Sequence, residues 1–577
     1  MFKEEIIKAL QRATSEKDIQ VEFPENEEHG DYSTNVAMLI AKRQNKSPLE
    51  VARKIVSKLQ KDSTLTGTTD RIEVAGGGFI NFFLNREYLL KKLEEIVSKK
   101  EKFGRSSILQ GKIFLIEHTS PNTVKTLHIG HVRNNVLGMT LHNLFEAIGA
   151  KVTMDAINND RGIHVMKAVW AYLKYGHGRT PQSENKKPDH FVDKFYRMGV
   201  KAERDEKIKK KMQELLRRWE AGDEKVRAIW KKLRDWTYAG FLETYKRLGS
   251  LHDYQWFESD FYEEGKKIVL EGLKKGIFRR LDDGAVLSDL SKYNLPDTII
   301  LRADGTTMYH TQDLRLTQLK REKFPSDKYF WVIGPEQTLY LKQLFAMAEK
   351  LGIGKREDYE HIAYGFVYLK GRGKMSSRAG NVISADWLMD RVVAKAKSII
   401  EKSETSRGLG EEEKQDVAEA AGIGAIKYSF LKVARLTDIY FDIDESLALE
   451  GNSSPYLQYT YARTQSIMAK SKIQNPNVNN LKIENWKLKT EEELVIRLLS
   501  RFPEIIIDAA KNYSPNLLCN YLFSLAQKYN TFYNSFRIVN APEGQESENF
   551  RLLLSKSVGQ VIKNGLELLG IKTPERM

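Results

Sequence analysis

Residues 111–150 read GKIFLIEHTSPNTVKTLHIGHVRNNVLGMTLHNLFEAIGA, and this stretch decides the fold. Its first part, Ile113 to Glu117, is a short apolar run, which predicts a strand buried in a sheet. After a loop, the tetrapeptide His128-Ile129-Gly130-His131 opens a helix. One face of that helix is apolar, at Leu137, Leu141, Leu144, Phe145 and Ile148. A second strand, expected from Val152 to Ile157, continues a parallel α/β pattern.

The two histidines of the tetrapeptide stand where a strand ends and a helix begins. Open α/β sheets bind phosphates at this place, because unpaired backbone N–H groups and the positive end of the helix dipole face the ligand. An imidazole N–H can donate to a phosphate oxygen, and Gly130 has no side chain that would hold a nucleotide away. The stretch therefore indicates nucleotide chemistry, with a plain helix cap as the alternative.

The bulk composition is that of a large globular protein with a basic balance of charge. Its 577 residues suffice for three or four domains, and 41% apolar and 10% aromatic residues can form packed cores. Lysine and arginine (92) exceed aspartate and glutamate (77), which gives a net charge of +15. That excess favours an anionic partner, nucleic acid first, with a solubilising surface as the alternative.

Cysteine use and hydropathy exclude two classes of protein. Cys519 is the only cysteine, which rules out a disulfide framework and a multi-cysteine zinc site and fits a reducing compartment. The first residues, MFKEEIIKALQRA, lack the apolar core of a signal peptide, and no run of about 18 apolar residues is present. We therefore expect a cytoplasmic protein with no membrane partner.

The pattern along the chain changes twice, which predicts three domains. Residues 1–105 are typical of a small α+β module. Residues 106–385 carry the parallel sheet, interrupted at about 165–260 by charged helices that we interpret as an insertion with a solvated face. Residues 386–577 are expected to be helical almost to the end.

Individual elements are expected inside these domains. In the first, helices are expected over 33–43 and 47–60, and a strand from Phe79 to Leu84. In the second, strand patterns over 297–302, 308–311, 329–333 and 361–369 are expected to complete the sheet, with a helix over 337–351.

A second motif, Gly373-Lys374-Met375-Ser376-Ser377-Arg378-Ala379-Gly380-Asn381, follows the last expected strand. Two cations and two hydroxyls on a glycine-flanked loop are typical of a mobile clamp on phosphates, with a basic surface loop as the alternative. It is not a P-loop, because Met375 stands where that motif needs Ser or Thr and no glycine has the required upstream spacing.

HIGH followed by KMSSR, in this order and with the sheet between them, resembles a class I aminoacyl-tRNA synthetase. The finer resemblance is to arginyl-tRNA synthetases and covers nearly the whole chain. It rests on these segments: 27–35 (EEHGDYSTN), 78–82 (GFINF), 117–122 (EHTSPN), 301–309 (LRADGTTMY), 451–459 (GNSSPYLQY) and 574–577 (PERM). The implied fold is a class I Rossmann-type catalytic domain, with an N-terminal α+β module for the tRNA D-loop and an all-α anticodon-binding domain.

The resemblance implies that ATP activates L-arginine, which is then joined to tRNA(Arg). The amino-acid carboxylate attacks the α-phosphate and pyrophosphate leaves, so the enzyme positions groups and stabilises charge. His128, His131 and Lys125 would act at the α-phosphate, with Gly130 beside the nucleotide. Lys374 and Arg378, with Ser376 and Ser377, would hold the other phosphates with Mg²⁺, and no protein-liganded metal is expected. Family members often lack the KMSK lysine and use the lysine before HIGH; this chain carries both.

The same resemblance implies an arginine pocket and two tRNA surfaces. The pocket would consist of Glu117, Asn122, Tyr309, Asp313 and Gln337, with acidic oxygens that hold a planar guanidinium. Phe79 and Asn81 project from one face of a strand and would stack on and read an unpaired D-loop nucleotide, with a core position for Phe79 as the alternative. The anticodon loop would meet Tyr456, Tyr459, Arg463, Tyr533 and Met577, although the stripe of the first three also suits a core. We expect a monomer.

The sequence departs from the family pattern at four positions and leaves some alternatives open. Met139, His164, Gln312 and Thr126 stand where the family usually has other residues, and none of them replaces a residue that is expected to take part in catalysis. One cysteine excludes a cysteinyl enzyme, and the insertion is too short and too helical for an editing domain. A class I lysyl-tRNA synthetase is the nearest other enzyme. A catalytically dead RNA-binding paralogue and a tRNA-independent adenylyltransferase are the remaining alternatives.

Overall fold

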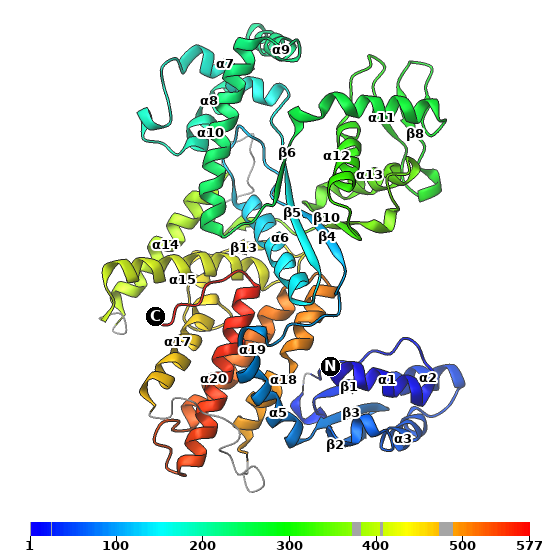
Figure 1. Cartoon of the computed structure of the whole chain (residues 1–577), viewed down its shortest axis with the longest axis vertical. Coiled ribbons are helices and arrows are strands. Elements are labelled where there is room, and N and C mark those ends of the chain that lie inside the picture. Colours follow the sequence, from blue (N-terminus) through cyan, green and yellow to red (C-terminus); the bar gives the residue numbers. More distant parts are fainter. Residues whose placement is uncertain (1, 25, 372–381, 404–407, 472–487) are drawn as a thin grey trace.

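The computed structural model describes the chain except residues 1, 25, 372–381, 404–407 and 472–487 (Figure 1). Figure 1 shows a small N-terminal part in blue, a helical C-terminal part in orange and red, and a central sheet that carries two lobes at the opposite end of the molecule. No helix in the described ranges is long and apolar enough to cross a membrane.

The N-terminal part is an antiparallel three-stranded sheet in the order β1-β3-β2, with helices packed on it. Ile80 and Phe82 of β3 are fully buried, whereas Phe79 lies on the other face and is 43% exposed. Helix α5 leads to the catalytic part. The bounds are α1 (Phe2–Thr14), β1 (Tyr32–Thr34), α2 (Val36–Gln44), α3 (Pro48–Leu59), α4 (Ser63–Thr66), β2 (Thr69–Ala75), β3 (Phe79–Leu84) and α5 (Arg86–Lys99).

The central sheet is parallel and covered on both faces. Its order is β11-β10-β4-β5-β6, formed by β4 (Ile113–Glu117), β5 (Lys151–Asn158), β6 (Tyr254–Phe257), β10 (Lys328–Val332) and β11 (Tyr359–Ile362). Phe114 and Ile116 of β4 pack with α6 (Ile129–Ala147), and Leu115 packs on the opposite side with α13 (Thr338–Lys350). The structure therefore confirms the doubly covered α/β sheet that the apolar run at 113–117 predicts.

The sheet differs from the sequence expectation in its later strands. Residues 308–311 are not a strand, because Gly305 (φ +79°) turns the chain, Leu301 pairs with Thr307, and α12 (Tyr309–Lys323) then begins. Residues 298–301 form β9 (Thr298–Leu301) of a separate antiparallel sheet. The run 361–369 divides between β11 and β12 (Val367–Leu369), which pairs outside the central sheet. Strand β6 lies in the range that was expected to be helical.

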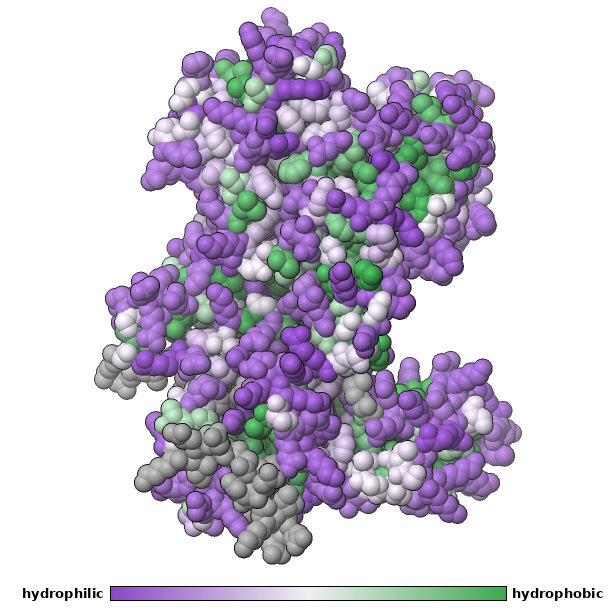
Figure 2. Space-filling model, viewed as in Figure 1, coloured by the Kyte–Doolittle hydropathy of each residue, from purple (hydrophilic) through white to green (hydrophobic). Residues whose placement is uncertain are grey.

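Two lobes rise beside the carboxyl ends of the strands (Figure 1). The first is helical: α7 (Ile163–Tyr175), α8 (Pro188–Ala202), α9 (Glu206–Glu220) and α10 (Glu224–Leu248). The second holds α11 (Tyr262–Lys274), α12, α13 and the antiparallel sheet of β7 (Arg279–Arg280), β8 (Val286–Ser288) and β9. Figure 2 shows that hydrophilic residues dominate the face in view, with small hydrophobic groups mainly on the second lobe.

The described residues of the C-terminal part are helical apart from one strand. Its elements are α14 (Ala385–Lys402), α15 (Glu411–Leu431), β13 (Ile439–Phe441), α16 (Ile443–Ser446), α17 (Ser454–Lys470), α18 (Thr490–Lys511), α19 (Asn516–Ser535) and α20 (Gln545–Leu568). Its helices share one buried core with α6 and with the N-terminal part. At that junction Glu504 of α18 accepts from the Tyr32 hydroxyl (3.0 Å) and the Lys3 backbone N–H (2.9 Å).

Candidate active site

A cavity of about 1180 Å³ lies at the carboxyl ends of β4, β5 and β10. Parallel sheets place ligands at this edge. Of the residues expected at the nucleotide and the amino acid, the cavity is lined by Glu117, Asn122, Lys125, His128, Gly130, His131, Tyr309, Asp313 and Gln337. Segments that are far apart in the sequence thus meet in one hollow, as the expected chemistry requires.

One side of the cavity is formed by Lys125, His128, Gly130 and His131, which we name the HIGH wall. His128 is the N-cap of α6: its Nδ1 accepts from the Gly130 backbone N–H (3.2 Å), and its own backbone N–H donates to His131 Nδ1 (3.1 Å). The two rings stack with centroids 3.7 Å apart. Because each Nδ1 is an acceptor, a neutral ring must carry its proton on Nε2. Both imidazoles are therefore held as Nε2–H donors.

The ionisation of the HIGH wall suits donors that remain neutral at pH 7. Burial, together with the charge of Lys125, lowers the pKa of His128 to about 4. Burial and then His128 and Lys125 lower the pKa of His131 well below its usual value. Burial also lowers the pKa of Lys125, whose ammonium lies 5.1 Å from the Tyr196 ring centroid. The wall thus offers two neutral N–H donors and one ammonium.

The turn between β4 and the HIGH wall depends on Thr119. This residue has φ +70°, a conformation that is strained for a β-branched side chain. Its backbone N–H donates to Asn134 Oδ1 at 2.6 Å, and its hydroxyl accepts from Asn135 Nδ2 at 3.0 Å. Helix α6 therefore holds the turn that carries Glu117 and Asn122. The sequence offered no signal for Thr119 because its conformation depends on these contacts.

The cavity is also lined by three acidic residues, Glu117, Glu258 and Asp313, which we name the acidic wall. Glu117 is 3% exposed; its Oε1 accepts from the Ser120 hydroxyl (2.8 Å), and its Oε2 lies 2.8 Å from Lys320 Nζ. Lys320 also lies 2.7 Å from Asp155 Oδ2. Burial opposes the charge of Lys320, but Asp155 and Glu117 raise its pKa above the usual value. This buried lysine fixes the Glu117 carboxylate and was not expected from the sequence.

Asp313, on α12, is the second carboxylate of the acidic wall. Burial raises its pKa to about 6, against a hydrogen bond from the Tyr340 hydroxyl that lowers it. Tyr309 begins the same helix and is 79% exposed, so its ring stands at the rim of the cavity. Gln337 is exposed and lies just before α13. The set combines a buried anion with adaptable polar groups at the rim.

Glu258 is the acidic residue that the sequence analysis missed. Burial raises its pKa to about 7, opposed by Arg161 and reinforced by Asp313. Its Oε1 lies 3.8 Å from Arg161 Nη1. With its amide oriented toward these partners, Gln312 donates to Glu258 Oε1 at 2.9 Å and accepts from Arg161 Nη1 at 3.1 Å. A short strand that was expected to be helix carries Glu258 to the cavity, so no helical pattern could indicate it.

Of the other positions that depart from the family pattern, His164 lines the cavity, and burial lowers its pKa to about 4. Met139 lies on α6, where its Sδ accepts from the Leu251 backbone N–H at 3.2 Å. Thr126 is buried in the loop before HIGH. None of them displaces a residue of the HIGH wall.

Four residues expected to bind ATP, namely Lys374, Ser376, Ser377 and Arg378, lie outside the described residues. The described chain resumes at Val382, which lines the cavity. The Ile129 backbone N–H donates to Ile383 O (3.0 Å), and the Ala385 backbone N–H donates to Leu127 O (2.9 Å). Residues 383–385 therefore pair with the HIGH wall.

The residues expected to contact tRNA lie away from the cavity. Phe79 is exposed, whereas Asn81 is 4% exposed and its Oδ1 accepts from the Ser33 hydroxyl (2.7 Å). Phe79 is thus the member of this pair that a nucleotide can reach without a rearrangement.

The expected anticodon-loop residues form one cluster between α17 and α19. The guanidinium of Arg463 lies 5.0 Å from the Tyr459 ring centroid and 4.6 Å from that of Tyr533. Asn530 joins the cluster, because its amide bonds Arg463 Nη1 (2.6 Å) and the Tyr456 hydroxyl (2.8 Å). Met577 is partly buried and packs on the core of this part of the chain.

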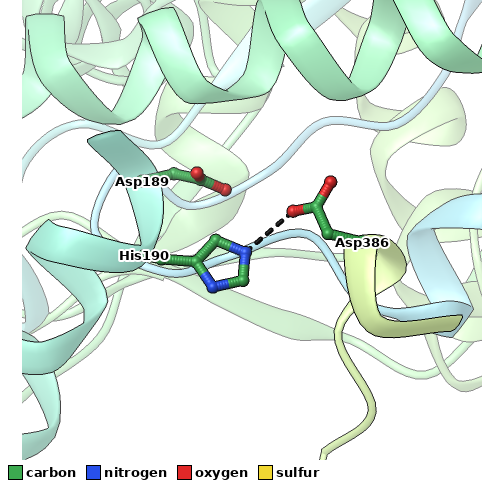
Figure 3. A group of neighbouring side chains, drawn as sticks. All are labelled: Asp189, His190 and Asp386. Atoms are coloured by element: carbon green, nitrogen blue, oxygen red, sulfur yellow. Dashed lines mark hydrogen bonds and ion pairs between the residues drawn. The ribbon is translucent and has the colours of Figure 1, made fainter. Parts of the chain in front are cut away.

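A group that resembles a metal centre lies outside the cavity. Asp189, His190 and Asp386 bring their potential ligand atoms within 4.8 Å of one another (Figure 3). The ammonium of Lys187 lies 2.8 Å from Asp386 Oδ2 and 3.4 Å from Asp189 Oδ1. The positive charge that two carboxylates require is therefore supplied by a side chain, which fits an ion-pair cluster better than a metal centre.

Comparison with known proteins agrees with this geometry. A family model for the catalytic domain of class I tRNA synthetases (R) matches residues 92–443, a model for the arginyl tRNA synthetase N-terminal domain matches 1–84, and a DALR anticodon-binding domain model matches 457–577. An arginine–tRNA ligase of Phocaeicola vulgatus is 36% identical over 588 residues, which cover 97% of this chain and 96% of that protein.

The chain belongs to the arginyl-tRNA synthetase family.

Further relatives agree with that assignment. An arginine–tRNA ligase of Borrelia hermsii is 38% identical over 513 residues, which cover 87% of this chain and 86% of that protein. The solved arginyl-tRNA synthetase of Thermus thermophilus superposes with a TM-score of 0.84 at 24% identity and covers 100% of both chains, which shows the shared fold. Membership of the family confirms the resemblance of HIGH, KMSSR and the flanking segments and decides against the lysyl enzyme.

Proposed function

We propose that the cavity is where this arginine–tRNA ligase joins its substrates, with ATP phosphates against the HIGH wall and the arginine guanidinium against the acidic wall. As a family member, the enzyme uses ATP to ligate L-arginine to tRNA through an arginyl-adenylate and releases AMP and pyrophosphate. The observation that carries the proposal is that His128, His131 and Asp313 line one cavity. Two neutral donors and buried anions match the two ends of the reacting pair.

The HIGH wall would stabilise charge as the arginine carboxylate attacks the α-phosphate. Bond formation at phosphorus and loss of pyrophosphate shift negative charge on to the phosphate oxygens, where preorganised N–H donors act most strongly. The Nε2–H groups of His128 and His131 would supply those donors, and Lys125 would supply a full positive charge. Gly130 would allow the nucleotide to approach the helix N-terminus. The protein needs no nucleophile of its own.

Residues of the KMSSR segment would complete the ATP site. Lys374 and Arg378 would bind the β- and γ-phosphates, and Ser376 and Ser377 would donate to them. Mg²⁺ would enter with ATP as part of the substrate complex, without ligands from the protein. The support for these roles is the sequence motif and the position of Ile383, which pairs with the HIGH wall.

The acidic wall would select arginine over other amino acids. Asp313 and Glu117 would pair with the planar guanidinium, while Tyr309 and Gln337 would contact the substrate from the rim. Asn122 would hold its α-amino end. A neutral analogue such as citrulline would leave the Asp313 carboxylate without a counter-charge, which is a costly arrangement.

Recognition of tRNA(Arg) would use the N-terminal and the C-terminal parts of the chain. We assign residues 1–105 to D-loop binding, with Phe79 and Asn81 as contacts; 106–385 to catalysis; and 386–577 to anticodon binding. The support is the exposed Phe79 ring and the cluster of Tyr456, Tyr459, Arg463 and Tyr533, with Met577 nearby. Aromatic rings and an arginine are suited to unpaired bases and phosphates. We further propose a monomer that acts in the cytoplasm, where its product enters translation.

The test is charging of tRNA with [¹⁴C]arginine by the purified protein. We expect arginine to be attached to the 2′-hydroxyl, so a tRNA that ends in 2′-deoxyadenosine is not charged and one that ends in 3′-deoxyadenosine is. The reversed preference would contradict the acceptor assignment. Binding of tRNA without charging would favour the catalytically dead paralogue.

A further inference from the structure

A partly buried ionic cluster joins the helical lobe to the start of α14. Asp386, the second residue of α14, has Oδ2 2.8 Å from Lys187 Nζ and 2.8 Å from His190 Nε2. Its Oδ1 accepts from the Thr244 hydroxyl of α10 (3.1 Å). Figure 3 shows His190 and Asp189 reaching from α8 toward Asp386 on α14. One carboxylate thus ties together three helices.

The cluster holds its partners in a fixed arrangement. Asp189 is fully buried, and neither of its oxygens has a hydrogen-bond partner apart from the charge of Lys187 at 3.4 Å. A Cβ at Gly240 of α10 would lie 2.3 Å from Asp189 Oδ1, so the helices are packed as closely as a glycine permits. Removing the charge of Lys187 or Asp386 leaves the oppositely charged partner without a counter-charge. The packing of these helices is therefore sensitive to a single substitution in the cluster.

Asp386 stands directly beside a segment that contacts the catalytic groups. Ser384 caps α14, and Asp386 lies in its first turn, where a negative charge favours the helix dipole. The preceding backbone pairs with the HIGH wall through the bonds from Ile129 N–H to Ile383 O and from Ala385 N–H to Leu127 O. His128 itself forms a β-bridge with Ser384. A shift of the α14 start would therefore reach the imidazole of His128.

Helix α8 reaches the HIGH wall by a second route. Asp193, one turn after His190, is 6% exposed and exerts an attraction on Lys125. The Tyr196 ring lies under the Lys125 ammonium at 5.1 Å. The face of α8 that carries His190, Asp193 and Tyr196 thus touches both the start of α14 and the lysine before HIGH.

We propose that Lys187 and Asp386 are positioning residues of the activation step: through their ion pair, helix α8 sets the place of residues 383–385 and thereby the orientation of His128 toward ATP. The inference rests on the proposed role of His128. Misplacement of a catalytic group by about 1 Å can cost about 100-fold in rate. An ion pair that does not touch the reacting atoms can therefore have a measurable effect on the rate of activation.

The experiment compares two neutral substitutions on α14 in arginine-dependent ATP–pyrophosphate exchange with tRNA present. Asp386→Asn removes the negative charge of the ion pair with Lys187. Asp390→Asn is the matched control, because Asp390 also pairs across to α10, with Arg247, but one turn further from the HIGH wall. We expect Asp386→Asn to lower kcat about tenfold or more and to raise the KM for ATP, with the KM for tRNA unchanged. Asp390→Asn should stay within about twofold of wild type.

Lys187 supplies a second pair of variants that separates positioning from folding. Lys187→Arg keeps the charge and should retain most of the exchange rate, whereas Lys187→Gln should lose as much as Asp386→Asn. Rates are expressed per active site from a burst titration, so unfolded protein does not contribute. The proposal is overturned if Asp386→Asn and Asp390→Asn behave alike, or if Asp386→Asn only lowers the Tm. If wild-type enzyme fails to exchange with arginine, the proposed function fails instead.

Discussion

At the scale of single residues, the proposed arginine pocket predicts that selection of arginine depends most on Asp313. This carboxylate lines the cavity, and among the described residues its hydrogen-bond donor is the Tyr340 hydroxyl. Asp313→Asn removes the charge that a guanidinium needs. Breaking a buried charge pair costs about 2–5 kcal/mol, so we expect kcat/KM for arginine to fall at least about 30-fold. Steady-state exchange over a range of arginine concentrations measures the loss.

Two variants serve as controls for Asp313. Tyr340→Phe removes one neutral hydrogen bond and should cost about tenfold or less. Asp304→Asn changes an exposed acid on the hairpin before α12 and should leave kinetics unchanged. An Asp313→Asn enzyme with wild-type KM for arginine would remove Asp313 from the pocket.

The acidic wall also predicts how arginine affinity depends on pH. Burial raises the pKa of Asp313 to about 6 and that of Glu258 to about 7 in the empty site. A bound guanidinium favours the ionised carboxylates, so below pH 6 binding must first remove protons and affinity falls. We expect the KM for arginine to decrease as pH rises from 5.5 to 8 and then level off. Calorimetry in buffers of different ionisation enthalpy should show proton release near pH 6.5; a pH-independent affinity would contradict this.

Some site residues were predictable from the sequence and others were not. The sequence pattern places Glu117 at a strand end and His128 at a helix start, whereas Asp313 was expected only from the family resemblance. Lys320 and Glu258 carry no such signal. Lys320 lies on α12, and from the sequence alone it would be placed on the surface. It is buried because the register of β4 with β5 sets Glu117 beside Asp155, and both carboxylates pair with its ammonium. The roles of the site residues in binding ATP and arginine come from the family resemblance. The geometry of the cavity is consistent with these roles, which remain proposals.

At the scale of elements, the start of α6 has both a structural and a chemical role. His128 caps the helix through Nδ1 and offers Nε2–H to the cavity. His128→Ala should lose about 100-fold in exchange rate and about 1 kcal/mol of stability. His128→Asn should lose a similar rate but retain the stability, because asparagine also caps helices. Exchange kinetics and thermal unfolding measure the two effects; equal stability losses in the two variants would contradict the capping role.

The elements of the parallel sheet could be predicted where local pattern and tertiary environment agree. The run 113–117 is apolar on both faces and forms β4 with those bounds. The run 308–311 failed as a strand, because Asp304-Gly305 closes a hairpin and the next residues start α12. Strand β6 was missed because its four residues follow long helices and gain their partners only from β5.

At the scale of the whole molecule, the helical C-terminal part should contribute to tRNA affinity and not to chemistry. Arg463 lies between two tyrosine rings on the surface of α17 and α19. Arg463→Ala should raise the KM for tRNA about tenfold. The slope of log tRNA affinity against log salt concentration should decrease by about one, because one fewer counterion is released. The kinetics for arginine and ATP should stay unchanged at saturating tRNA. Lys470→Ala, at the exposed end of the same helix, is the control. An equal effect of both variants would indicate that the positive surface attracts tRNA without a specific contact at Arg463.

Changes of pattern predict a division of the chain into three parts, but they do not predict the contacts between those parts. The bond from Tyr32 to Glu504 joins residues 472 positions apart. Helix α8 meets Asp386 across 196 residues. Such contacts depend on how the lobes pack, for which hydropathy and motif spacing carry no information.

The most direct test of the cavity as an arginine-activating site is ATP–[³²P]pyrophosphate exchange with each amino acid, with and without tRNA. The donors of the HIGH wall and the carboxylates of the acidic wall predict that, of all the amino acids, only arginine supports exchange. The family resemblance predicts that this exchange requires tRNA. Exchange that responds to lysine and not to arginine, by a folded protein that binds ATP, would contradict the assignment of the acidic wall.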